Sequence, residues 1–221
     1  MTHRWVVISK VALWGACLAP LALLVLRALE VNSLSLGANP VEEVLNVCGK
    51  TGLNLLILTL SITPIRRSTG INRLIAFRRL LGLFAFFYLL LHFLTYALLD
   101  LGLAWDMLFE DITKRPYITV GFTALVLLVP LAVTSTSRLQ RRLGRNWIKL
   151  HRLVYAIALL AVVHYWWQTK LNVTEPLLYA ALLAVLLGVR VQHAWLANRK
   201  RRLSVDAKAP MSPTYRPIEP P

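Results

Sequence analysis

Long apolar runs separated by short, arginine-rich segments dominate the chain. A bilayer core of about 30 Å needs roughly 20 apolar residues in a helix. Six stretches approach or reach that length with few charges. We therefore predict an all-α, polytopic membrane helix bundle with six transmembrane helices, at about Val11–Leu29, Val47–Ile65, Leu80–Leu99, Tyr117–Thr136, Leu153–Thr169 and Pro176–Leu196.

The first apolar run has a second interpretation, as a cleaved signal peptide. Its length is at the upper end for such a segment, and Arg27-Ala-Leu-Glu30 follows it in place of a small-x-small cleavage pattern. We therefore expect a retained transmembrane helix.

Composition and charge sharpen this picture. The 221 residues include 25 Lys+Arg and 10 Asp+Glu, a net charge of +15, yet 57% of the chain is apolar. Such a composition excludes disorder for most of the chain and argues against an ordinary soluble nucleic-acid binder. The two cysteines, Cys17 and Cys48, are too few for a disulfide framework, and the common nucleotide-binding and hydrolase motifs are absent.

The cations are distributed unevenly between the connections. Nineteen of them fall at the N-terminus, in the second and fourth connections and in the tail, whereas five fall on the opposite side. The positive-inside rule then places both termini in the cytoplasm. Arg190, inside the last apolar run, is expected to reach the inner interface. Residues 1–202 form the membrane domain, and the proline-rich residues 203–221 are expected to be a disordered cytoplasmic tail.

Two histidines interrupt the apolar runs at matching depth. His92 lies 12 residues after Leu80, and His164 lies 11 residues after Leu153. Both helices run outward in this topology, so both imidazoles lie roughly 16–18 Å from the cytoplasmic end. Placing an ionisable group in a bilayer costs free energy, so such residues indicate a functional or structural role. The alternative to a shared function is that each ring is hydrogen-bonded to a neighbouring helix.

An iron porphyrin suits such a pair, because neutral imidazole is a good axial ligand and a helix bundle covers the apolar ring. Spacing therefore favours His92 and His164 as the axial ligands of a haem iron. Small residues next to them, Gly82, Ala85 and Ala161, are expected to make room for a flat ring.

His151 is a third candidate for a cofactor ligand. It is predicted to begin the fifth transmembrane helix, with Trp147 and Tyr155 on the same face. A second, symmetric haem at this depth would face Arg78 and Arg79 in place of a histidine. The alternatives are a haem with an unusual partner, a flavin or quinone site, or a cap on the helix end. His3 and His193 lie at the water boundary and are expected to be ordinary polar residues.

The sequence resembles the MsrQ (YedZ) family of haem-binding membrane subunits, part of the wider ferric-reductase-like transmembrane group. The resemblance covers about residues 30–170 in order. The stretches that carry it are Leu36-Gly-Ala-Asn-Pro40, Ile62-Thr-Pro-Ile-Arg66, Arg78-Arg-Leu-Leu-Gly82 leading to His92, Lys114-Arg-Pro-Tyr117, Thr134-Ser135, Leu143-Gly-x-x-Trp147-x-x-x-His151 and His164-Tyr165.

The resemblance implies a role in repairing oxidised envelope proteins. Members carry haem b, are associated with FMN, and pass electrons from the quinone pool or a cytosolic flavin reductase to a periplasmic molybdopterin methionine-sulfoxide reductase, MsrP. On the matching positions His92 and His164 are the haem ligands, and His151 matches a histidine also tied to haem binding. The chain would then be an electron-transfer subunit in the inner (plasma) membrane of a bacterium, without a substrate-converting site of its own.

Two other functions stay open at this point. A stand-alone ferric or oxygen reductase would need an attached flavin domain, and a transporter would favour inverted repeats and broken helices, which we do not find in the sequence. For the electron-transfer role, the acidic residues Asp106, Glu110 and Asp111 are expected to help a periplasmic partner dock.

Overall fold

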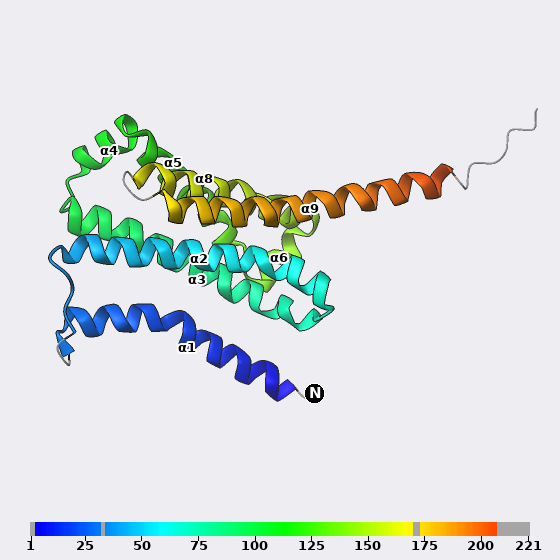
Figure 1. The fold of residues 1–221 in the computed structure, drawn as a ribbon, viewed down its shortest axis with the longest axis horizontal. Coiled ribbons are helices and arrows are strands. Elements are labelled where there is room, and N and C mark those ends of the chain that lie inside the picture. Colours follow the sequence, from blue (N-terminus) through cyan, green and yellow to red (C-terminus); the bar gives the residue numbers. More distant parts are fainter. Residues whose placement is uncertain (1–2, 32–33, 170–172, 207–221) are drawn as a thin grey trace, which may run out of the picture.

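The computed structural model describes residues 3–31, 34–169 and 173–206, and within these ranges it contains helices but no strand. Six segments are long and apolar enough to cross a bilayer, which confirms the all-α, six-span prediction. Their main helices are α1 (His3–Ala28), α2 (Pro40–Thr69), α3 (Ile75–Thr95), α5 (Pro116–Val133), α8 (Val154–Gln168) and α9 (Thr174–Asp206) (Figure 1).

Short elements join these helices: η2 (Asn72–Leu74), the π-helical turn η3 (Tyr96–Asp100), α4 (Trp105–Lys114), α6 (Ser137–Leu143) and α7 (Arg145–His151). The predicted fifth span, Leu153–Thr169, agrees with α8, but the prediction that His151 begins this helix is wrong, because His151 ends α7 and a turn separates it from α8. At the other end of the chain α9 continues to Asp206, so residues 203–206 of the expected tail are helical. The remaining tail, 207–221, lies outside the described residues.

Helix α2 begins and ends at recognisable signals. The Asn39 side chain accepts a hydrogen bond from the backbone N–H of Glu42 (3.3 Å), and Pro40 occupies the first helical position, where no N–H is needed. Gly70 closes the helix in the left-handed conformation, with φ 72°. The helix therefore starts seven residues before the predicted Val47, which brings the polar N-terminal turns of α2 into the bundle.

Four helices form the centre of the bundle. Helix α2 packs along α3 and α5 packs along α8, while contacts of α3 with α5 and of α2 with α8 join the two pairs. Leu56, Leu60 and Ile157, on these helices, are fully buried. Helix α1 contacts α2 and α3, and α9 contacts α2 and α8, so these two helices flank the centre (Figure 1).

Tyr88 on α3 fastens α1 at its proline. In a regular helix the N–H of Leu21 would bond the carbonyl of Cys17, but Pro20 disturbs this part of the ladder. The Tyr88 hydroxyl lies between the two groups: it accepts from Leu21 N (3.2 Å) and donates to Cys17 O (2.7 Å). Trp14 of α1 also packs edge-on against Phe84, with ring centres 4.9 Å apart.

Arg190 on α9 likewise bonds a backbone group that a proline leaves unpaired in α2. Pro64 has no N–H, so the carbonyl of Leu60, four residues earlier, lacks its helical partner. The Arg190 guanidinium of α9 donates to this carbonyl, and its centre lies 5.3 Å from the ring centre of Tyr155. Arg190 is therefore held by the carbonyl that Pro64 leaves free. That its charged group also reaches the inner interface stays a prediction.

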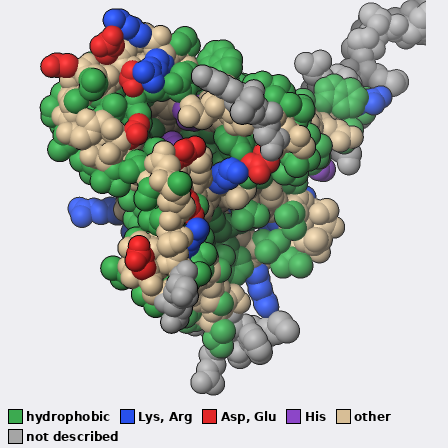
Figure 2. Space-filling view, turned by 60° about the vertical axis from the view of Figure 1, so that its left-hand side comes forward, with side chains coloured by type: hydrophobic (Ala, Val, Ile, Leu, Met, Phe, Trp, Pro, Cys, Tyr) green, Lys and Arg blue, Asp and Glu red, His purple; other side chains and the backbone are tan. Residues whose placement is uncertain are grey.

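The two ends of the bundle differ in charge. The connection between α2 and α3 and the α6–α7 segment, both rich in arginine, lie at one end, and α4 lies at the other (Figure 1). Acidic side chains are spread over the α4 end, with a few Lys and Arg side chains (Figure 2). Ion pairs at this end join Arg27 to Glu43, Lys50 to Glu175, Lys114 to Glu110 and Arg115 to Asp111.

Removing the Tyr88 hydroxyl should loosen α1. The Tyr88→Phe change leaves two buried backbone groups unpaired at about 1–3 kcal/mol, so local opening should become roughly tenfold more frequent. In a Cys48→Ala background the buried Cys17 is the sole thiol, and its rate of reaction with a membrane-permeant maleimide reports the opening. As a control, Tyr179→Phe removes an exposed bond to Asn54 and should leave the rate unchanged. An unchanged rate in Tyr88→Phe would contradict this role.

Candidate functional site

The structure brings the two intramembrane histidines together. His92 lies three residues before the end of α3, and His164 lies four residues before the end of α8. Their ring centres are 6.4 Å apart, and the ring planes make an angle of 76°. The two imidazoles, 72 residues apart in the sequence, therefore lie next to one another near the α4 end of the bundle.

Backbone carbonyls set the protonation of both rings. The Nδ1 atom of His92 lies 2.9 Å from the carbonyl oxygen of Leu45 on α2, and that of His164 lies 2.7 Å from the carbonyl oxygen of Tyr117 on α5. A carbonyl only accepts hydrogen bonds, so each Nδ1 carries the proton and donates. Each Nε2 then keeps its lone pair, which is the form in which imidazole binds a metal.

The distance between the rings fits a shared metal ion. A metal–nitrogen bond is about 2 Å and a ring nitrogen lies about 1 Å from the ring centre, so imidazoles on opposite sides of one metal have centres roughly 6 Å apart. His92 and His164 match this spacing. In the described part of the chain no cluster of three or more His, Cys, Asp or Glu side chains forms another metal site. The pair thus fits the two axial positions of a haem iron.

Two glycines contact the paired histidines. The imidazoles lie against Gly49 of α2 and Gly121 of α5. The sequence reasoning missed these two, although the distance from glycine to histidine is 43 residues in both cases. Of the small residues expected to make room for a flat ring, Gly82 faces Thr59 of α2, Ala85 is buried in the core and Ala161 packs against the core; their role beside a cofactor stays a prediction.

His151 belongs to a separate polar cluster. It stacks on Trp147, with ring centres 4.0 Å apart, and its Nε2 lies 3.2 Å from the hydroxyl of Thr134. Because that hydroxyl donates its own hydrogen to the carbonyl of Pro130 (2.6 Å), the Nε2 of His151 must be the donor. His151 thus uses in a hydrogen bond the nitrogen that His92 and His164 leave open.

The expected common face of Trp147, His151 and Tyr155 is correct only for the first two residues. The helix breaks after His151, and Tyr155 lies beyond the break, beneath Arg190. Of the two boundary histidines, His193 is exposed, and the side chain of His3 lies outside the described residues.

Comparison with known proteins identifies a family for the chain. The family described as "Ferric reductase like transmembrane component" matches residues 48–162. The chain is 51% identical to the "Protein-methionine-sulfoxide reductase heme-binding subunit MsrQ" of Xanthomonas campestris pv. campestris (strain 8004), over 96% of this chain and 97% of that protein. The protein of the same name from Ralstonia nicotianae is 49% identical, over 90% and 91% of the two chains. No solved structure matches the chain.

The chain belongs to the MsrQ family. The region that matches the ferric-reductase-like family begins next to Gly49 and contains both His92 and His151, and His164 follows two residues after its end. The resemblance to MsrQ found in the sequence is thereby confirmed over nearly the whole chain.

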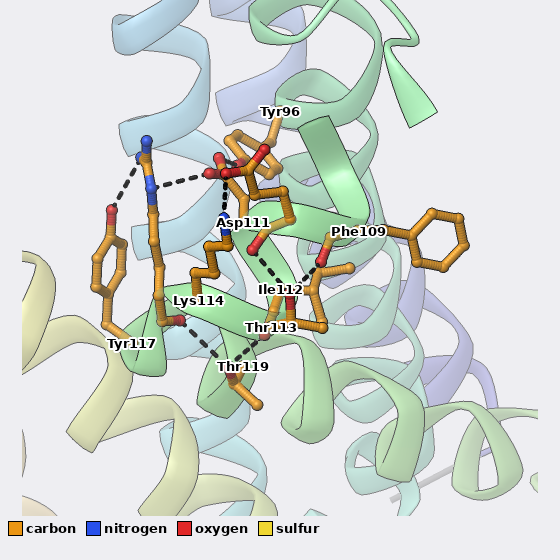
Figure 3. A network of polar contacts seen from close by, with 10 residues as sticks. Tyr96, Phe109, Asp111, Ile112, Thr113, Lys114, Tyr117 and Thr119 are labelled. Atoms are coloured by element: carbon orange, nitrogen blue, oxygen red, sulfur yellow. Dashed lines mark hydrogen bonds and ion pairs between the residues drawn. The ribbon is translucent and has the colours of Figure 1, made fainter. Parts of the chain in front are cut away.

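In this MsrQ-family chain, Asp111 links the α2–α3 pair to the α5–α8 pair at the α4 end of the bundle, near the histidines. Its carboxylate accepts a hydrogen bond from Tyr96, four residues after His92, and pairs with Arg115 (2.9 Å), two residues before Tyr117 (Figure 3). Its side chain is only 13% exposed. Asp111 therefore belongs to the protein's own packing, and of the three acidic residues expected at a partner surface only Asp106 and Glu110 are exposed there.

The Asp111→Ala change should destabilise this end of the bundle. It leaves the half-buried Tyr96 hydroxyl without its acceptor, at about 1–3 kcal/mol, which lowers the midpoint of thermal unfolding by several degrees. Glu110→Ala, in the same helix, removes only an exposed pair with Lys114 and should cost about 0.3–0.5 kcal/mol. Equal thermal midpoints for the two variants in detergent would show that Asp111 has no such role.

Proposed function

We propose that this chain is the haem-binding, electron-transfer subunit of a methionine-sulfoxide reductase system. The observation that carries the proposal is the pairing of His92 and His164, with both Nε2 lone pairs available and ring centres at the spacing for one metal. The names of its relatives, heme-binding subunits of such a reductase, support the same role.

In this proposal His92 and His164 are the axial ligands of a haem b. A haem supplies one-electron redox chemistry, and its potential depends on its ligands and on its burial. The chain's own part is to hold the two imidazoles in one tautomer, at one spacing and away from water. The carbonyls of Leu45 and Tyr117 accept hydrogen bonds from the Nδ1–H groups and so fix the orientation of both rings.

Donor and acceptor would be other components of the system. The connections between the described spans are short, so substrate conversion is assigned to a periplasmic molybdopterin subunit of the MsrP type. Electrons would come from the quinone pool or from a cytosolic flavin reductase, and FMN is included on the family resemblance. The excess of cations at one end supports an inner-membrane orientation with both termini in the cytoplasm.

The role of His151 decides whether the protein holds one haem or two. Its hydrogen bond to Thr134 and its stacking on Trp147 support a structural role at the junction of α7 and α8. The alternative is a second haem with an unusual partner. A haem-to-protein ratio near one supports the structural role, whereas a ratio near two that falls by half in His151→Ala supports the second haem.

Replacing either paired histidine should abolish the six-coordinate haem. In detergent-purified protein from haem-sufficient cells, we expect a sharp Soret band with α and β bands on reduction. His92→Ala and His164→Ala should each lose this low-spin spectrum, because each removes one axial ligand. The matched control His193→Ala removes an exposed histidine and should keep it. A colourless wild-type protein, or full low-spin haem in His164→Ala, would refute the proposal.

A further inference from the structure

Each of the paired imidazoles occupies the space that a side chain would fill at a glycine of the neighbouring helix, Gly49 of α2 for His92 and Gly121 of α5 for His164. A β-carbon added at Gly121 would come within 2.7–2.9 Å of three atoms of the His164 ring, including Nδ1. One added at Gly49 would lie 3.0 Å from Nδ1 of His92 and 3.2 Å from Cε1. Such approaches are closer than ordinary packing contacts, so any larger residue would displace the ring or its helix.

The reason for a glycine at these positions follows from helix geometry. Gly49 comes four residues after Leu45, and Gly121 comes four residues after Tyr117. In an α-helix the carbonyl of residue i accepts the N–H of residue i+4, so the side chain at i+4 stands next to that carbonyl. A carbonyl oxygen has a second lone pair, but an imidazole reaches it only where residue i+4 has no side chain.

The same unit occurs twice. In each half of the bundle the histidine follows its glycine by 43 residues and its carbonyl partner by 47 residues. The first unit spans α2 and α3, and the second spans α5 and α8. The sequence shows no obvious repeat because only these contacts recur, whereas the carbonyl residues, leucine and tyrosine, differ. Because the same contacts recur between helices of different sequence, we interpret them as a feature of the site and not as chance packing.

We infer that Gly49 and Gly121 are positioning residues, which admit His92 and His164 to the helix carbonyls and so aim both Nε2 atoms into the gap between the rings. This inference rests on the proposed haem site. It predicts that an added methyl group acts through the histidine: the ring loses its carbonyl, turns or shifts, and no longer presents Nε2 at the 6.4 Å spacing.

The test compares alanine variants of four glycines in purified, haem-containing, full-length protein. Gly121→Ala should lose most of its low-spin haem and gain high-spin haem, and Gly49→Ala, where the contact is less close, should lose a smaller share. Gly52→Ala is the matched control for steric clash, because its β-carbon would come within 2.7 Å of Leu89, not of a histidine. Gly188→Ala, with no atom within 4 Å of the added carbon, controls for the substitution itself.

Added imidazole distinguishes positioning from general damage. It should restore the low-spin spectrum of Gly121→Ala and Gly49→Ala by replacing the displaced ring, and it should change neither control. If Gly121→Ala does not accumulate, the milder Gly49→Ala decides. Wild-type-like spectra in both variants would overturn the inference while leaving the proposed function intact. A wild-type protein without haem would overturn the proposed function itself, and this inference with it.

Discussion

The hydrogen bond from each imidazole Nδ1 to a helix carbonyl is the contact on which the site depends. A histidine inside a bilayer is costly unless it stays neutral and finds a partner. Leu45 and Tyr117 supply that partner through the backbone, so the ring keeps its outer nitrogen free for a metal. The same bond demands a glycine one turn further along and a neighbouring helix at contact distance. One polar contact thereby constrains the tautomer, the packing and the spacing of the rings.

The surrounding helices follow a related rule, that no backbone group in a bilayer is left without a partner. Prolines break this rule locally, and side chains from other helices repair it. Tyr88 closes the ladder of α1 next to Pro20, and Arg190 occupies the carbonyl that Pro64 leaves free. Because each repair comes from another helix, the same contacts fasten the outer helices α1 and α9 to the centre. Tyr88 is also one turn before His92, so the attachment of α1 lies next to the site.

The features that depend on local sequence pattern could be predicted from the sequence. Apolar run length predicts the six spans, and counting along two of them predicts that His92 and His164 meet. The sequence did not reveal Gly49 and Gly121, because their role depends on which residues of two packed helices face each other, and no single helix encodes that register. The break after His151 was missed for a related reason: a helical pattern of apolar residues continues across the turn at Arg152 and Leu153.

In the proposed site, His92 and His164 would hold one haem iron between nearly perpendicular imidazole rings. Electron paramagnetic resonance of the oxidised, full-length protein tests this arrangement most directly. Two neutral imidazoles make ferric haem low-spin, and planes near the observed 76° leave its d-orbitals nearly degenerate, so a strongly anisotropic low-spin signal is expected. An ordinary rhombic signal would contradict the ring arrangement, and a purely high-spin signal would contradict the pairing of the two histidines.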